Sequence, residues 1–169
     1  MKKKSKAEFE KLYQTAAVMY AQLRAGDVLY SSIGPSTFFF SHAGIVGQDG
    51  NIYHAHPSGG IAESLPAYLS RHRYGGTLTL LRPKTDPAEA AAWAAQHIGS
   101  MKGYRFNRTL ADTNWNYCTK FVWQAFSSGC GIDLSAATVK LSKRWIFPRH
   151  IKRSSHFNPI AKFSLEYRL

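Results

Sequence analysis

Cysteine is scarce in this chain of 169 residues, in which only Cys118 and Cys130 occur. The two lie in one segment with a helical pattern, where a rise of about 1.5 Å per residue separates them beyond the reach of a disulfide. Two free thiols indicate a reducing compartment. The sequence therefore predicts no intrachain disulfide and leaves Cys118 available for chemistry.

Long apolar runs are also missing. No stretch approaches the roughly 18–20 apolar residues that span a bilayer. The basic start at residues 1–4 resembles the first part of a secretory signal, but Glu8, Glu10 and Lys11 interrupt the apolar run that such a signal requires next. We expect no transmembrane segment and, by default, a cytoplasmic location, with delivery or export by another route left open.

Acidic residues are few: 10 Asp and Glu stand against 22 Lys and Arg, which gives a net charge of +12. The excess gathers near both ends, at Lys2, Lys3, Lys4, Lys6, Lys140, Lys143, Arg144, Arg149, Lys152 and Arg153. A basic surface attracts anionic partners such as nucleic acid, a wall polymer or lipid headgroups. An ordinary solvated face is the competing interpretation.

Hydrophobic periodicity predicts an α+β protein. Apolar residues recur every three or four positions over 7–23, which is typical of an amphipathic helix, and an Asp-Gly turn at 49–50 favours a hairpin. We expect strands at 28–30, 38–46, 52–56, 61–63 and 77–81, a helical turn at 65–70, helices at 86–97 and 118–128, a loop at 101–116, and short helical pieces and loops after residue 148. The hairpins favour an antiparallel sheet packed on helices.

Cys118 is the first candidate for catalysis. It precedes Phe121 by three residues and Val122 by four, so it lies on the inward face in the first turn of the expected helix. Unpaired N–H groups and the helix dipole at this end lower a thiol pKa, and the same N–H groups can stabilise an oxyanion. The alternative is an inert buried cysteine, the role that we expect for Cys130.

A thiol nucleophile needs a base, and His42 is the candidate because small residues follow it in a predicted strand. His54 lies on the paired strand, where it can orient the His42 ring; His56 has the same parity and is its rival. A zinc centre made of His42, His54, His56 and Cys118 is the competing interpretation. None of these residues has the close paired spacing of a zinc motif, so we expect no metal and no cofactor.

Several short motifs follow one another along the chain: Gly26-Asp27-Val28-Leu29, Ser41-His42-Ala43-Gly44-Ile45-Val46, Gly103-Tyr104-Arg105-Phe106-Asn107, Tyr117-Cys118-Thr119-Lys120-Phe121-Val122-Trp123 and Phe147-Pro148-Arg149-His150-Ile151. In this order they resemble the circularly permuted NlpC-type cysteine peptidases of the papain-like superfamily, close to the YiiX-like group. In relatives the third catalytic position is often Glu, whereas here it is His54, and Ser-Glu often follows the Cys where this chain has Thr119-Lys120.

The resemblance implies a permuted papain-like fold, with a small antiparallel sheet or barrel against helices and the nucleophile at a helix N-terminus. The resemblance covers roughly residues 24–155, the expected catalytic core. The length of 169 residues fits a single domain over residues 1–169, in which we expect a basic segment and helix at 1–23 and a tail at 156–169. Cys118, His42 and His54 are the implied triad. We expect Tyr30, Tyr104, Tyr117 and Lys120 to bind substrate, with Lys120 favouring an anionic group.

The implied activity is attack on an acyl carbon through a thioester. We expect hydrolysis of an amide in a peptide of peptidoglycan type or another small amidated molecule. One alternative is acyl transfer to an amine or lipid, as in proteins resembling lecithin-retinol acyltransferase. The other is a non-catalytic basic module that binds an anionic polymer through the basic ends of the chain.

Overall fold

The computed structural model describes residues 6–32, 41–72, 76–135 and 143–165. Its helices are α1 (Lys6–Tyr20), α2 (Leu65–Ser70), α3 (Ala88–His97), the 3-10 turn η2 (Ile98–Ser100), α4 (Cys118–Cys130) and α5 (Pro148–Lys152). Its strands are β1 (Val28–Ser31), β2 (His42–Val46), β3 (Ile52–His56), β4 (Gly59–Glu63), β5 (Gly76–Pro83), β6 (Gly103–Tyr104), β7 (Trp115–Asn116) and β8 (Phe157–Leu165). The expected strand residues 38–40, the lysines at 2–4 and Lys140 lie outside the described residues.

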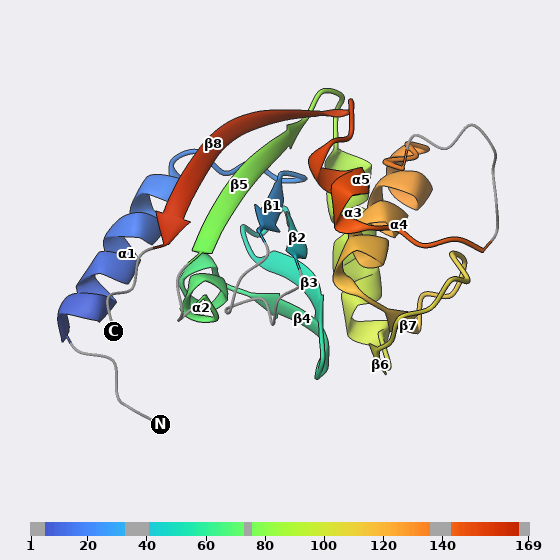
Figure 1. The fold of residues 1–169 in the computed structure, drawn as a ribbon, viewed down its shortest axis with the longest axis horizontal. Coiled ribbons are helices and arrows are strands. Elements are labelled where there is room, and N and C mark those ends of the chain that lie inside the picture. Colours follow the sequence, from blue (N-terminus) through green and yellow to red (C-terminus); the bar gives the residue numbers. More distant parts are fainter. Residues whose placement is uncertain (1–5, 33–40, 73–75, 136–142, 166–169) are drawn as a thin grey trace.

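Six strands form one antiparallel sheet in the order β4-β3-β2-β1-β5-β8, and β6 pairs with β7 in parallel. Helices α1 and α2 lie on one side of the sheet and α3, α4 and α5 on the other (Figure 1). The expected α+β class and the antiparallel hairpins are confirmed. Within the described residues, no helix is long and apolar enough to cross a membrane.

The central strands are buried on both faces because each face has its own core. Side chains alternate along β1: Val28 and Tyr30 belong to the core beneath α3 and α4, whereas Leu29 belongs to the core beneath α1 and α2. In the same way Ile45 faces α4 and Val46 faces α2. The two cores hold β2 rigidly between the helix that carries Cys118 and the helix that follows β4.

The Gly-Asp step before β1 fixes the start of the sheet. Gly26 has φ +80°, and a Cβ there would lie 2.2 Å from the Cβ of Pro87, so only glycine fits. The buried Asp27 accepts hydrogen bonds from the Arg24 N–H at 2.9 Å and from Arg82 Nε and Nη2 at 3.0 and 2.8 Å. This carboxylate therefore ties the α1–β1 connection to β5.

Replacing Asp27 with alanine is expected to lower the free energy of unfolding by about 3 kcal/mol, because it removes the buried carboxylate and leaves the Arg82 guanidinium without its opposite charge. Urea unfolding followed by circular dichroism measures the loss. Asp49→Ala is the control, since Asp49 is exposed in the β2–β3 turn and should cost about 1 kcal/mol or less. Equal losses for the two variants would contradict the role given to Asp27.

The C-terminal segment differs from its prediction. We expected helical pieces and loops there, but residues 157–165 form β8, which pairs with β5 along its whole length. β8 is an edge strand, and its register shifts opposite Leu80 and Leu81, beside Pro159. An edge strand with a bulge accommodates a proline that cannot donate to a ladder. The boundary proposed at residue 156 therefore does not separate a tail from the sheet.

Two helix ends also differ by small amounts. Helix α4 was expected to stop at Gly129 but continues to Cys130, and Gly131 with φ +69° ends it. Helix α3 begins at Ala88, one residue after the expected Pro87, and the Asp86 carboxylate accepts from the Ala88 N–H at 3.0 Å.

Candidate active site

Cys118 is the first residue of α4, and its sulfur lies against the strand segment that carries His42. The Sγ–H donates to the Ser41 carbonyl at 3.8 Å, and the Ala43 N–H hydrogen-bonds to the sulfur. The backbone on both sides of His42 therefore contacts the sulfur. The expected position of Cys118, at a helix N-terminus next to the His42 strand, is what the structure shows.

The electrostatic state of the thiol differs from the expectation. Burial raises the pKa of the Cys118 thiol above its ordinary value and outweighs the hydrogen bonds from the Ala43 and Thr119 N–H groups and from the Tyr104 hydroxyl, which lower it. The helix-terminus argument considered only the lowering effects. Cys118 is therefore a neutral thiol near pH 7, and a base must take its proton during attack.

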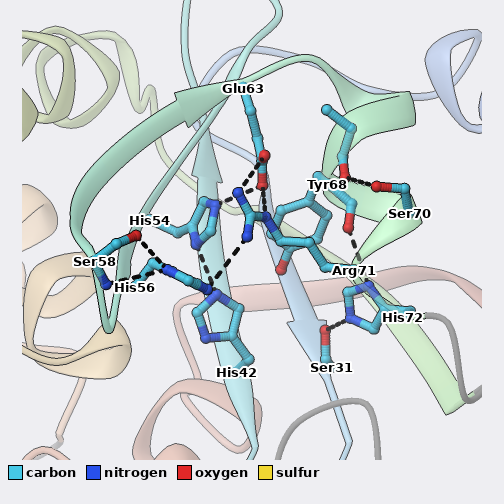
Figure 2. A network of polar contacts seen from close by, with 11 residues as sticks. Ser31, His42, His54, His56, Ser58, Glu63, Tyr68, Ser70, Arg71 and His72 are labelled. Carbon is cyan, nitrogen blue, oxygen red and sulfur yellow. Dashed lines mark hydrogen bonds and ion pairs between the residues drawn. The ribbon is translucent and has the colours of Figure 1, made fainter. Parts of the chain in front are cut away.

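The His42 ring is held by His54, as the hairpin register predicted. His42 Nε2 and His54 Nδ1 are 3.0 Å apart (Figure 2). Gly44 makes room for this contact, because a Cβ there would lie 2.8 Å from Ile52 Cγ2 and 3.3 Å from His54 Cβ. Burial holds the pKa of His42 well below 6.5, because it penalises the charged imidazolium.

Neutral His42 is suited to act as a base, with Nδ1 as the ring nitrogen that the bond to His54 leaves unused. Among the described residues, no hydrogen bond joins the Cys118 sulfur to the His42 ring. In free enzymes such contacts are often long and shorten only when substrate binds.

Beyond His54 the network continues through residues that the sequence pattern did not reveal. His54 Nε2 lies 2.8 Å from Glu63 Oε1 on β4, and Arg71 donates to both carboxylate oxygens at 2.6 and 2.9 Å. Arg71 Nη1 also lies 3.2 Å from His56 Nε2. His56, the rival of His54, therefore contacts Arg71 and Ser58 rather than His42 (Figure 2).

Glu63 is ionised at any working pH. Burial alone raises the pKa of its carboxyl, but hydrogen bonds from His54 and Arg71 more than offset this effect and lower the pKa to about 2. The signal for Glu63 was present in the sequence, because a hairpin closed at residues 57–58 places residues 61 and 63 beside His54. The predicted strand at 61–63 therefore presents Glu63 on the same face as His54.

Among the four residues expected to bind substrate, Tyr104 contacts Cys118. Its hydroxyl hydrogen-bonds to the Cys118 sulfur, and burial together with the nearby sulfur raises the pKa of this hydroxyl. Tyr30 and Tyr117 are buried and bonded within the protein: Tyr30 donates to Ser41 Oγ at 2.8 Å, and the Tyr117 hydroxyl accepts from the Ile146 N–H at 2.8 Å. Their contact with substrate remains a prediction.

Lys120 has a different place from the one we expected. Its side chain is fully buried, and Nζ donates to the carbonyls of Asp112 and Trp115 at 2.7 and 3.0 Å. Gln124, one turn later on α4, donates to the carbonyls of Leu110 and Asp112. These contacts connect the segment before Cys118 to α4. Because the Lys120 ammonium is buried in them, Lys120 is not part of the proposed substrate site.

A row of aromatic rings extends from Tyr104 through the buried Tyr117 to two exposed members, Phe106 and Trp145. Ring contacts join Tyr104 to Phe106, Phe106 to Tyr117, and Tyr117 to Trp145, with centroids 5.6, 5.2 and 6.2 Å apart. Phe106 is 56% exposed and Trp145 is 36% exposed. This aromatic row, Tyr104–Phe106–Tyr117–Trp145, begins at the sulfur and presents apolar surface to solvent.

Comparison with known proteins identifies a family and a fold for this chain. A family model described as permuted papain-like amidase enzyme, YaeF/YiiX, C92 family, matches residues 13–156. The protein YycO of Bacillus subtilis (strain 168), described as uncharacterized, is 24% identical over 139 residues, which cover 80% of this chain and 54% of YycO. The chain therefore spans about half the length of this curated relative.

A solved structure has the same fold. The crystal structure of YiiX from Escherichia coli O157:H7, described as a metalloprotein, matches with a TM-score of 0.64 and 14% identity, covering 84% of this chain and 98% of YiiX. In this chain, no group of three or more His, Cys, Asp or Glu residues could hold a metal within the described ranges.

Proposed function

Because the chain belongs to the permuted papain-like amidase family, we propose that it is a cysteine amidase with Cys118 as nucleophile, His42 as general base and His54 as the residue that orients His42. One observation carries the proposal: the Cys118 sulfur lies at the N-terminus of α4 against the backbone on either side of His42, whose ring is hydrogen-bonded to His54. Nucleophile, base and orienting group in this order are the elements of a triad.

The reaction proceeds through a thioester. As Sγ attacks the amide carbon, His42 Nδ1 takes the thiol proton and then gives it to the leaving amine, which departs as the C–N bond breaks. A water, deprotonated by the same nitrogen, attacks the thioester; the acid leaves and the proton returns to the sulfur. The Cys118 N–H and the Tyr104 hydroxyl donate to the carbonyl oxygen as it becomes negative.

The substrate of this reaction is an amide in a peptide or a small molecule. Peptides of peptidoglycan type are the first to test, because a net charge of +12 favours encounter with an anionic wall polymer. The basic residues Arg149, Lys152 and Arg153 are exposed on and after α5. A neutral peptide and the same peptide on an anionic polymer should therefore differ in salt dependence.

Product analysis tests the function. Purified protein is incubated with stem peptides of peptidoglycan and with a set of acyl amides, with and without an added primary amine, and the products are separated by mass. The amidase predicts free acid and amine, with Cys118→Ala inactive. Products found only with the added amine would point to acyl transfer, and polymer binding without turnover would point to the basic module; either result contradicts the proposal.

The aromatic row gives a second expected outcome. We propose that it holds the apolar part of the substrate, so Phe106→Ala should raise KM for amides of large apolar acids by about tenfold, which corresponds to roughly 1.4 kcal/mol of lost apolar contact. Steady-state kinetics measures the KM of the wild type and of Phe106→Ala for an acetyl amide and for a phenylacetyl amide, and the KM increase should be confined to the phenylacetyl amide. Phe147→Ala is the matched control, because Phe147 is similarly exposed at 42% and contacts His150 instead of the row.

Equal KM changes for the acetyl and phenylacetyl amides in Phe106→Ala would remove the aromatic row from the substrate site. A KM change of the same size in Phe147→Ala would do the same.

A further inference from the structure

Glu63 occupies a place behind both imidazoles that neither the expected triad nor the family assignment requires. It lies on β4, at the edge of the sheet, and its register partner on β3 is Ile52. His54 pairs with Ile61, two residues before Glu63 on the same face, so the Glu63 carboxylate reaches His54 diagonally across the hairpin. Only 11% of its side chain is exposed.

From these contacts we infer that Glu63 is a positioning residue for the amidase, which fixes the tautomers of His54 and His42 and supplies the negative charge that His54 lacks. The inference rests on the proposed function and extends the triad to Cys118–His42–His54–Glu63. In relatives the third catalytic position often holds a carboxylate, whereas here it holds His54. Glu63 supplies a carboxylate next to this imidazole.

The tautomers follow from what each atom can donate. An ionised carboxylate only accepts hydrogen bonds, so the proton between Glu63 and His54 is on His54 Nε2. A neutral His54 then presents a lone pair at Nδ1, and the proton of the next bond is on His42 Nε2. His42 Nδ1 is left without a proton and is the atom that receives the thiol proton.

Glu63 also affects the charge that His42 acquires during the reaction. When His42 takes the thiol proton it becomes an imidazolium, and a second neutral imidazole stabilises this cation weakly. Glu63 lies on the far side of His54 and provides the opposite charge. Arg71 partly neutralises this charge, and its hydrogen bonds to the two carboxylate oxygens, at 2.6 and 2.9 Å, fix the orientation of the carboxylate. The negative charge of Glu63 therefore raises the pKa of His42, and the positive charge of Arg71 lowers it.

Several other titratable groups surround the two rings, and none of them is substituted in the experiment below. Tyr68 of α2 packs against both rings, with centroids 6.1 Å from His42 and 5.2 Å from His54. His56 on β3 and His72 after α2 also lie near His42, and Cys118 on α4 lies near Tyr68. His72 is buried and bonded to Ser31, and burial lowers its pKa to about 4, so it stays neutral above that pH.

The test compares Glu63→Gln with Arg71→Gln. Glu63→Gln keeps the size of the side chain and removes its charge; we expect kcat to fall about 10- to 100-fold with KM unchanged, and the acid limb of the pH profile to move to lower pH. Arg71→Gln should move the same limb to higher pH. Asp49→Asn is the control, because Asp49 is an equally charged residue of the neighbouring β2–β3 turn that bonds to Asn51 and Tyr53.

A second readout needs no substrate. ¹⁵N NMR of the histidine rings in the free protein should show the Nε2–H form of both His42 and His54 at neutral pH, and loss of the single form of His54 in Glu63→Gln. This result stands even if no amide is hydrolysed, so failure of the inference is distinguishable from failure of the proposed function. An Nδ1–H form of His54 in the wild type would overturn the inference.

An equal shift of the acid limb in Asp49→Asn would overturn it as well. So would a loss of kcat in Glu63→Gln with an unmoved limb and unchanged ring tautomers, because that combination describes a purely structural residue.

Discussion

Replacing Cys118 with serine is expected to lower kcat/KM for amide hydrolysis by about 10⁴-fold. The proposed mechanism gives Cys118 the bond-forming role, and removal of a nucleophile leaves only binding and oxyanion stabilisation, which account for a small part of the rate. Serine preserves the size of the side chain, so the buried contact with the Ser41 carbonyl changes little. Steady-state kinetics and circular dichroism together measure the loss and verify the fold.

The second cysteine provides the matched control for this experiment. Cys130 ends the same helix, is also a free thiol, and contacts the Asp86 carbonyl at 3.8 Å instead of the strand that carries His42. Cys130→Ser should therefore keep kcat/KM within about twofold of the wild type. Activity that survives in Cys118→Ser, or that is lost equally in Cys130→Ser, would contradict the assignment.

Replacing His42 with glutamine is expected to lower kcat by about 10³-fold, because general-base catalysis contributes that order of magnitude. The pH dependence is the sharper signature. His42 must be unprotonated to act, and its pKa lies well below 6.5, so the wild-type rate is complete at neutral pH and is lost as the pH falls through the pKa of His42. His42→Gln should remove this acid limb.

His97→Gln is the control for His42→Gln. The His97 ring stacks on Trp93 at the end of α3, with centroids 4.0 Å apart, and has no contact with the imidazole pair among the described residues. Its substitution should leave both the rate and the acid limb unchanged. An acid limb that persists in His42→Gln would mean that another group is the base.

The sequence predicted the parts of the site that depend on local pattern. A helix that starts at Cys118, a strand that starts at His42 and a hairpin that returns through His54 each have short-range signals, and the hairpin parity alone places the two histidines on one face. These elements bring the nucleophile segment and the base segment together. The family model and the YiiX structure agree with the expected family and fold.

The parts that could not be predicted depend on burial and on contacts between distant segments. The pKa of Cys118 was expected to fall, because the helix N-terminus was visible in the sequence whereas the burial that raises this pKa was not. Lys120 looked like a cation for substrate, but its ammonium group binds two carbonyls of the preceding segment. Strand β8 pairs with β5, about eighty residues away, and such a pairing has no local signal.

Alkylation by iodoacetamide tests the central claim, that His42 activates a neutral Cys118 thiol. The rates at Cys118 and Cys130 are followed by mass spectrometry from pH 5 to 10 in the wild type and in His42→Gln. We predict that at pH 7 Cys118 reacts about tenfold faster in the wild type than in His42→Gln, with Cys130 unchanged, and that its rate still rises above pH 9. A Cys118 rate that is independent of residue 42 would contradict the account.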